Sequence, residues 1–155
     1  MVAQCFGQGA APSIVEQPSA TFSMVENWVQ LAEDADDGSN EFRQGISMLK
    51  QLLGSLKPDQ TVLMNNYPNP FNPETWIPYH LSQDSAVVIS IYDMTGQIVR
   101  KLDMGYQTFG YYVGRDNSAY WDGRTESGEL VSSGTYFYQL ETDQYSETRK
   151  MVILK

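Results

Sequence analysis

The spacing of hydrophobic and polar residues changes once along this chain, from a helical period to a strand period. Between residues 23 and 56 the apolar positions recur every three or four residues, whereas from Trp76 onward they alternate with polar ones. The first spacing places apolar side chains on one side of a helix, and the second places them on one face of a strand. The pattern therefore predicts a helical N-terminal part and a β-sheet C-terminal part.

Two short helices joined by a polar turn are predicted over residues 23–57, after a flexible arm over residues 1–22. Ser23 and Glu26 fit a capping box at the start of the first helix. A second helix is expected to start near Asn40. Helices of this length are marginally stable alone, so we expect the hairpin to dock on the C-terminal part. The predicted docking residues are Trp28, Phe42, Ile46, Leu49 and Leu53.

Residues 58–75 are rich in proline and predict a rigid, extended lead-in rather than a helix. Pro68, Pro70 and Pro73 restrict φ and remove backbone donors. The residue before each proline is also pushed toward extended conformations. A central strand is therefore not expected before Trp76. The expected hydrophobic anchors of this segment are Tyr67, Phe71 and Trp76.

Residues 76–155 predict an immunoglobulin-like antiparallel β-sandwich of about seven strands, so the expected fold class is mainly β with a preceding helical hairpin. Strand-like segments are separated by turn signals roughly every 8–12 residues, as is typical of such sandwiches. Two turns pair an aspartate, which accepts backbone hydrogen bonds, with a glycine, which tolerates positive φ. These pairs are Asp93 with Gly96, and Asp122 with Gly123 beyond Trp121. The expected core residues are Ile77, Tyr79, Leu81, Val87, Ile89, Ile91, Trp121, Tyr136, Tyr138 and Leu140.

Charge and reactive residues argue against several functions. The net charge is −9 and neither half has a basic patch, so binding to nucleic acid is not expected. No apolar run is long enough to span a bilayer. One histidine, His80, lies on a predicted strand, and one cysteine, Cys5, lies in the predicted arm. Neither belongs to a catalytic motif, so we predict no enzyme activity and no cofactor.

Two further features leave an alternative open. Residues 34–40 form an acidic run that resembles a calcium loop, but its register places Gln44 where a calcium loop needs glutamate. The preferred interpretation is a polar helix–helix turn, with incidental calcium binding as the alternative. Cys5 is interpreted as an incidental surface thiol, with a covalent link to another chain as its alternative.

Four segments, taken in order, resemble a known family. They read NYPNPFNP-x-T-x-I-x-Y-x-L, I-Y-D-x-x-G-x-x-V-R-x-L, Y-W-D-G-R-x-x-x-G-x-x-V-x-S-G-x-Y-F-Y-x-L and T-R-K-M-V-I-L-K. Over residues 66–155 this order resembles the type A C-terminal sorting domain of proteins exported by the type IX, or Por, secretion system. Residues 121–140 are also similar to the immunoglobulin-like domain of flagellar hook-capping proteins.

The resemblance implies a non-catalytic domain that is recognised by the outer-membrane secretion and sortase machinery. Its cargo would pass through the periplasm and outer membrane, to be anchored at the cell surface or secreted. The implied sorting-motif residues are Pro68, Asn69, Pro70 and Ile77 in the first box, Asp93, Gly96 and Val99 in the middle box, and Gly134, Tyr136, Lys150 and Lys155 in the terminal box. Trp121, Asp122 and Gly123 are expected to have a structural role in a turn.

Two other functions stay open at this point. One is a structural module that packs against copies of itself or against neighbouring cell-surface domains, as in a filament or a hook cap. The other is a carbohydrate-binding module, although aromatic residues of a sandwich more often belong to its core. The aromatic residues that would form a sugar-binding platform are Tyr106, Phe109, Tyr111 and Tyr112, around Gly105 and Gly110.

Overall fold

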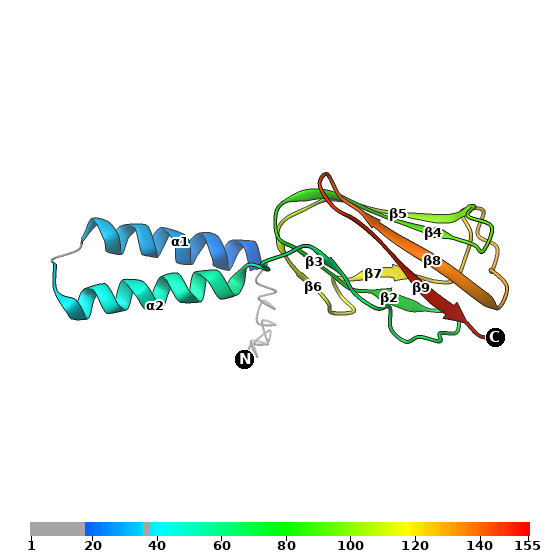
Figure 1. Cartoon of the computed structure of the whole chain (residues 1–155), viewed down its shortest axis with the longest axis horizontal. Coiled ribbons are helices and arrows are strands. Elements are labelled where there is room, and N and C mark those ends of the chain that lie inside the picture. The colour runs from blue at the N-terminus through cyan, green and yellow to red at the C-terminus, as the bar shows by residue number, and fades with distance from the viewer. Residues whose placement is uncertain (1–17, 36–37) are drawn as a thin grey trace, which may run out of the picture.

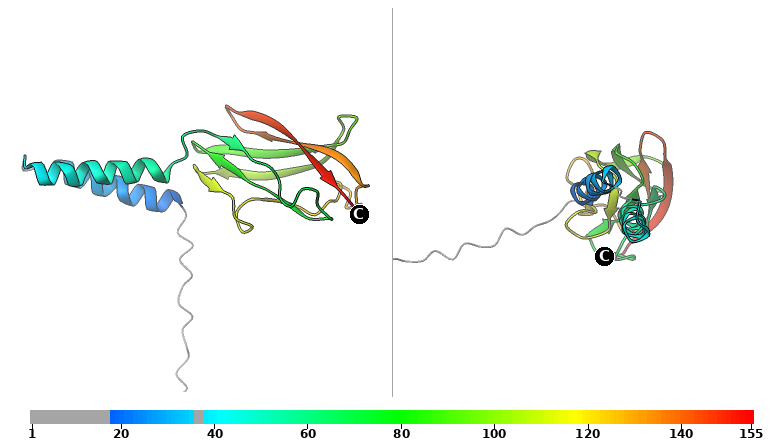
Figure 2. Two further views of the ribbon diagram at one scale, coloured as in Figure 1. Left: turned by 60° about the horizontal axis from the view of Figure 1, so that its bottom comes forward. Right: turned by 90° about the vertical axis from the view of Figure 1, so that its left-hand side faces the viewer.

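A helical hairpin extends from one end of a β-sandwich (Figures 1 and 2) in the computed structural model, which describes residues 18–35 and 38–155. The two helices, α1 Pro18–Asp34 and α2 Asn40–Leu56, run antiparallel. The strands of the described part are β1 Val62–Leu63, β2 Thr75–Ile77, β3 Tyr79–Leu81, β4 Ser85–Tyr92, β5 Ile98–Gln107, β6 Gly110–Tyr112, β7 Ala119–Trp121, β8 Gly134–Glu141 and β9 Ser146–Ile153. The predicted mainly β class with a preceding helical hairpin is confirmed.

The sandwich has two antiparallel layers. One layer is a four-stranded sheet in the order β5-β4-β8-β9, and the other consists of the smaller sheets β1-β3-β6 and β2-β7. Alternate side chains of a strand face the same side, so each layer turns one apolar face inward. All ten predicted core residues are buried, with at most 6% of any of them exposed.

The proline-rich segment differs from the predicted extended lead-in. Val62–Leu63, which lie between Pro58 and Pro68, already form β1, which pairs with β3. The chain then closes a loop, because Tyr67 and Trp76 exchange two backbone hydrogen bonds of 2.9 Å. Prolines exclude a helix, as predicted, but they permit turns. The residues that close the loop, Tyr67 and Trp76, are not prolines, so each has a backbone N–H group that can donate.

The first helix begins at Pro18, so the predicted start at Ser23 is wrong. Proline is well tolerated in the first turn of a helix, where its missing N–H group would have no helical partner. Part of the predicted flexible arm is therefore helical, while residues 1–17 lie outside the described residues. Within the described part, no helix has both the length and the hydrophobicity needed to cross a membrane.

The second helix begins at Asn40, as predicted. Ser39 is its N-cap, and its side-chain oxygen accepts a hydrogen bond of 3.3 Å from the backbone N–H of Phe42. This bond satisfies one of the helical donors that have no partner at an N-terminus. The cap provided by Ser39 thus explains why the polar turn ends and the helix begins at Asn40.

The predicted docking of the hairpin along the sandwich is wrong, because the hairpin projects away from it (Figures 1 and 2). At the base of the hairpin, the Phe22 ring packs edge-on against Phe109, with the ring centroids 4.7 Å apart. Lys57 Nζ lies 5.4 Å from the centre of the same Phe109 ring. Trp28, a predicted docking residue, is 52% exposed. The two sheet layers already cover each other's apolar faces, so they leave no large apolar face for the helices.

Candidate functional site

Several loops and the C-terminus lie at the end of the sandwich remote from the helices (Figure 1). We define this region as the remote end and describe it by three segments: the 66–76 loop, the 121–134 segment, and the end of β9 through Lys155. They are distant in sequence, yet backbone contacts join them: Phe71 bonds to the end of β9, Trp121 pairs with Thr75, and Gly134 pairs with Ile153. The remote end is therefore a surface that exists only in the folded domain.

The proline-rich loop is attached directly to the final strand. Phe71 N–H donates to the Val152 carbonyl, and Leu154 N–H donates to the Phe71 carbonyl, both at 3.0 Å. The Asn69 side-chain oxygen accepts a further bond of 3.1 Å from Val152 N–H. The Phe71 side chain is 2% exposed, so it anchors the loop in the core. The first and terminal boxes thus form one structural unit.

Two buried polar residues brace this loop from inside. Asn66 and Thr75 are 3% and 0% exposed, and the Asn66 side-chain nitrogen donates to the Thr75 hydroxyl at 2.9 Å. Both side chains also donate to the Pro68 carbonyl, each at 3.2 Å. Sequence reasoning missed this pair, because a buried asparagine looks like one more turn residue in an Asn- and Pro-rich run.

The Trp121 turn packs against the proline loop at close range. The Phe71 and Trp121 rings lie 5.6 Å apart. Gly123 has φ +70°, and a Cβ atom added there would lie 2.7 Å from the Pro73 carbonyl oxygen. The Asp122 side chain accepts a bond of 3.1 Å from the backbone N–H of Arg124. Glycine is needed at position 123 for both its φ angle and the close approach of the loop.

The Trp121 side chain links the turn to the terminal box. Its Nε1–H donates to the Arg124 carbonyl at 2.9 Å, and its ring lies 5.9 Å from that of Tyr136. Tyr136 is buried and donates its hydroxyl hydrogen to the Ser132 carbonyl at 3.0 Å. Tyr136 therefore holds the start of β8 against the loop before it.

The C-terminal residue closes the same surface. The backbone N–H of Lys155 donates to the Ser133 hydroxyl at 3.0 Å, and its ammonium donates to the Val131 carbonyl. Gly134 pairs with Ile153 at the start of β8. Lys150 lies further back on β9 and is exposed, so Lys155 belongs to the remote end while Lys150 is presented along the strand.

The middle box forms the β4–β5 turn. The Asp93 carboxylate accepts hydrogen bonds from Thr95 N–H at 2.8 Å and Gln97 N–H at 3.1 Å. Hydrogen bonding, first of all from the Thr95 hydroxyl, holds the pKa of Asp93 below its ordinary value. Gly96 has φ +83°. The carbonyl of Val99, near the start of β5, accepts a bond of 2.9 Å from Glu126 N–H, which connects this box to the 121–134 segment.

The structure does not gather every implied residue at one surface. Ile77 is 0% exposed, so its contribution is to the core. Val99 is half-buried and packs against the same core. The residues that present groups at or near the surface of the sandwich come from all three boxes: Pro68, Asn69, Pro70, Asp93, Gly96, Gly134, Lys150 and Lys155.

The four aromatic residues of the carbohydrate hypothesis do not form one platform. Tyr111 and Tyr112 are neighbours on β6, so they face opposite sides. Tyr112 stacks on Tyr79 with ring centroids 4.8 Å apart, and Tyr111 meets His80 edge-on at 4.7 Å. Phe109 packs against Phe22 at the base of the hairpin. The contacts of Phe109, Tyr111 and Tyr112 are thus structural ones, and Tyr106 is 71% exposed on β5.

A different aromatic group consists of Trp76 on β2, Tyr120 on β7 and Tyr67. Tyr67 and Trp76 were predicted as hydrophobic anchors, but sequence spacing did not indicate their grouping with Tyr120. The Trp76 ring stacks on Tyr67 at 6.1 Å and lies 5.6 Å from Tyr120. The Arg115 guanidinium lies 4.4 Å from the centre of the Trp76 ring, close enough for a cation–π contact. Because Tyr67, Tyr120 and Arg115 already pack against Trp76, this group supports the mouth of the proline loop.

The acidic turn and the cysteine give no further information. Asp36 and Asp37 of the acidic run, and Cys5, lie outside the described residues. Among the residues that are described, no three His, Cys, Asp or Glu side chains are grouped so that they could hold a metal ion.

The sequence profile of the FlgD Ig-like domain family matches residues 73–146. These residues include seven of the strands in full, β2 to β8, and the first residue of β9. The C-terminal part of this chain is an immunoglobulin-like sandwich. A comparison with curated proteins gives no match.

Three solved structures are similar to parts of this chain. Dimeric latent PorU from Porphyromonas gingivalis is 22% identical, with a TM-score of 0.49, over 63% of this chain and 9% of its own. FlgD from P. aeruginosa is 28% identical, with a TM-score of 0.37, over 47% of this chain and 54% of its own. PorZ, an essential surface component of the type IX secretion system of P. gingivalis, is 17% identical, with a TM-score of 0.41, over 63% of this chain and 12% of its own. The matched part of this chain spans a small part of the length of PorU and PorZ and about half of the length of FlgD.

Proposed function

We propose that residues 58–155 are a non-catalytic C-terminal sorting and anchoring domain, which directs a protein across the outer membrane to the cell surface. Its partners would be the outer-membrane secretion and sortase machinery, which would recognise the surface of the remote end. The observation that carries this proposal is the attachment of the proline loop to the final strand through Phe71, Asn69 and Val152. Two motif boxes that are far apart in sequence thereby become a single recognition surface.

The type A sorting domain of the type IX system is the specific class that we propose. The order of the motifs over residues 66–155 supports it, and the assembled remote end gives those motifs a common location. Recognition by a folded surface needs neither a pocket nor a catalytic group. The only histidine, His80, is held edge-on against Tyr111, which agrees with a structural role for it.

Export of a reporter protein tests the proposal. Residues 58–155, which include β1, are fused to a periplasmic reporter in a host that has a type IX machine. We expect protease-accessible reporter at the cell surface, and we expect deletion from Tyr145 onward to abolish it. Because that deletion removes a whole strand, point variants are needed as well. Asn69→Ala and Lys150→Gln are expected to lower surface display while the domain stays folded.

Matched controls separate recognition from folding. Asn117 also accepts a bond from a backbone N–H, that of Gly114 at 2.8 Å, but it belongs to no box. Lys101 is exposed on β5, the other edge strand of the larger sheet. Asn117→Ala, Lys101→Gln and His80→Ala should therefore leave export intact. A folded wild-type domain whose reporter stays in the periplasm would exclude the sorting role and favour assembly.

A further inference from the structure

The helical hairpin leaves a group of large apolar side chains uncovered. More than half of the surface of each is exposed, although the same helices bury Val29 and Ile46 in the seam between them. The exposed residues are Met24 (51%), Trp28 (52%) and Leu31 (58%) on α1, with Met48 (67%) and Leu52 (54%) on α2. We name these five residues the apolar hairpin face.

The five residues share one side of the hairpin, as helical geometry shows. On each helix, an apolar stripe faces the other helix. Each of the five residues comes one position before a residue of this inward-facing stripe: Trp28 precedes Val29, and Leu52 precedes Leu53. One residue corresponds to a rotation of about 100° around the helix. Because the helices run antiparallel, a step back of one residue turns clockwise on one helix and counterclockwise on the other when both are viewed from the same end. Both exposed stripes therefore point to the same side of the plane that contains the helices.

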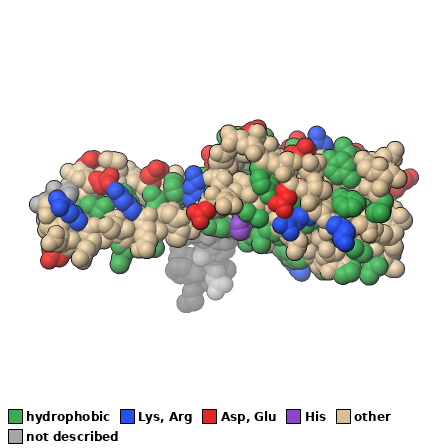
Figure 3. Space-filling view, in the orientation of Figure 1, with side chains coloured by type: hydrophobic (Ala, Val, Ile, Leu, Met, Phe, Trp, Pro, Cys, Tyr) green, Lys and Arg blue, Asp and Glu red, His purple; other side chains and the backbone are tan. Residues whose placement is uncertain are grey.

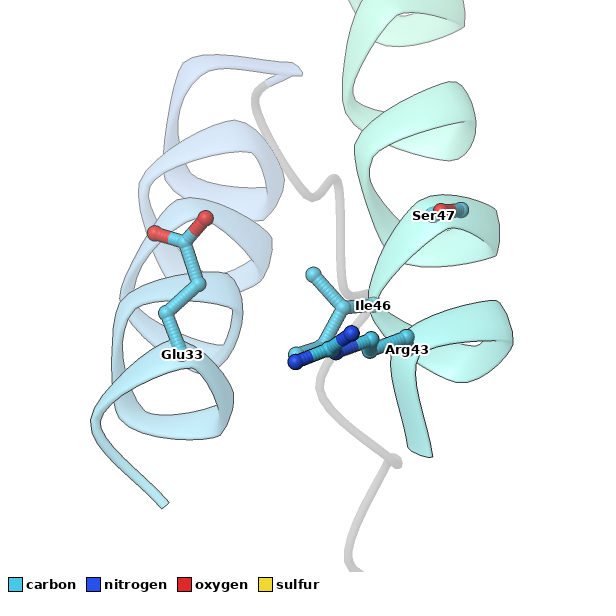
Figure 4. A pocket seen from close by; sticks show the side chains of 4 residues that line it. All are labelled: Glu33, Arg43, Ile46 and Ser47. Atoms are coloured by element: carbon cyan, nitrogen blue, oxygen red, sulfur yellow. The ribbon is translucent and has the colours of Figure 1, made fainter. Parts of the chain in front are cut away.

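The opposite side of the hairpin is charged, which agrees with this assignment. Glu33, Arg43 and Lys50 each follow an inward-facing residue by one position. Lys50 Nζ lies 2.5 Å from the Glu33 carboxylate, a distance that places both side chains on the same side of the hairpin. Figure 4 shows Glu33 of α1 beside Arg43, Ile46 and Ser47 of α2. In Figure 3, acidic and basic side chains are visible on the side of the hairpin that faces the viewer.

The area of the apolar hairpin face is sufficient for an interface. At roughly 200 Å² for a large apolar side chain, five residues exposed by half or more leave on the order of 500 Å². Monomers rarely expose a contiguous apolar patch larger than a few hundred Å². Two copies packed through these residues would bury on the order of 1,000 Å² in total, before any flanking residue is counted. That value reaches the lower bound of specific interfaces.

The position of the charges permits a second copy as the partner. Glu33, Arg43 and Lys50 lie on the opposite side of the hairpin, where Lys50 already pairs with Glu33, so two copies that meet through the apolar hairpin face bury none of these charges. A two-fold axis brings the same face of both copies together, and the area estimated above then favours a second copy of the chain as the partner. We infer that a second copy of this chain covers the apolar hairpin face, and that the two hairpins form a four-helix bundle.

The contacts of this dimer lie on the hairpins, which project away from the sandwiches (Figure 1). The remote ends stay uncovered. The dimer forms whether or not the sandwich is a sorting signal, so failure of the export experiment and failure of dimerisation are separate results.

Sedimentation equilibrium of the full chain tests the inference, with reducing agent present so that Cys5 forms no disulfide. We expect a reversible monomer–dimer equilibrium over a hundredfold range of concentration. Trp28→Gln should weaken dimerisation at least tenfold. Met48→Gln should weaken it less, because a thioether covers less area than an indole ring. Unchanged urea unfolding of the sandwich would show that each variant is folded.

The matched control is Met94→Gln. Met94 is 68% exposed in the β4–β5 turn, almost the same as Met48 at 67%, but it lies outside the hairpin. Its replacement should leave the dimer unchanged. A chain that stays monomeric at every concentration would overturn the inference, and so would equal effects of Met48→Gln and Met94→Gln.

Discussion

The sandwich and the hairpin use their apolar residues in different ways. In the sandwich, two sheet layers face each other, and core residues such as Tyr138 and Ile89 are 0% exposed. In the described part of the hairpin, the most buried apolar residues are Val29 at 7% and Ile46 at 9%. Two helices in contact cover only the seam between them, so the rest of each apolar surface stays exposed. The sandwich can thus satisfy its apolar surface within one chain, and the hairpin cannot.

The same difference determines where a recognition surface can be built. The remote end of the sandwich has loops from three parts of the chain that are fixed by backbone hydrogen bonds and by the buried rings of Phe71 and Trp121. A surface fixed in this way presents one conformation to a partner. The hairpin presents an apolar side without fixed loops, which is suited to association rather than to selective recognition.

The largest predicted effect separates the two regions by their tryptophans. Trp121 is 1% exposed and Trp28 is 52% exposed. Trp121→Ala should lower the free energy of unfolding by about 3–5 kcal/mol, because it opens a large cavity in the core. Trp28→Ala should change the unfolding of the dilute monomer by about 0.5 kcal/mol or less. Urea unfolding, followed by circular dichroism, measures both. Equal effects would mean that the two regions are packed alike.

The second prediction concerns the contact between the Trp121 turn and the proline loop. Gly123 and Gly128 both have positive φ, at +70° and +86°. Alanine at either position should cost about 1–2 kcal/mol for the left-handed conformation. At Gly123 the new methyl group also meets the Pro73 carbonyl oxygen, whereas at Gly128 it meets open space. Gly123→Ala should therefore destabilise the sandwich by about 1–3 kcal/mol more than Gly128→Ala. Equal losses in urea unfolding would disprove this close contact.

The third prediction is that the sandwich folds without the hairpin. The described contacts between them lie at the hairpin base, where Phe22 and Lys57 meet Phe109. Residues 58–155 should therefore keep a thermal midpoint close to that of the full chain. A peptide of residues 18–57 should show little helicity in dilute solution. A large fall in the midpoint of the sandwich would show that the hairpin is part of its core.

The smallest predicted effect is a dependence on pH. Burial lowers the pKa of His80 below its ordinary value of 6.5. The unfolded chain then binds a proton more readily than the folded one, so stability is complete above pH 6.5 and falls as the pH drops through that value. The wild-type chain should lose slightly more stability than His80→Gln between pH 7.5 and 5.5. An identical pH dependence of the two urea midpoints would contradict the partial burial of His80.

Local patterns in the sequence predicted the elements whose residues are close together in the chain. Alternation identified the β4 and β8 faces, and the Asp93 and Gly96 pair identified a turn by its backbone chemistry. The attachment of Phe71 to Val152 could not be predicted, because it joins residues far apart in sequence through backbone groups that every residue has. The prediction that Trp28 docks on the sandwich was wrong for a related reason. Helical periodicity shows that a stripe is apolar, but it does not show which surface covers the stripe.

Hydrogen exchange of individual backbone amides in the full chain tests the contrast between the two regions most directly. The β4 and β8 amides should exchange only through global unfolding, at a rate that does not depend on protein concentration. In dilute solution the α1 and α2 amides should exchange faster by orders of magnitude, and they should slow as the concentration rises and the four-helix bundle forms. Equal protection of the helices and the central strands at every concentration would contradict the account, because the hairpin would then be stable within a single chain.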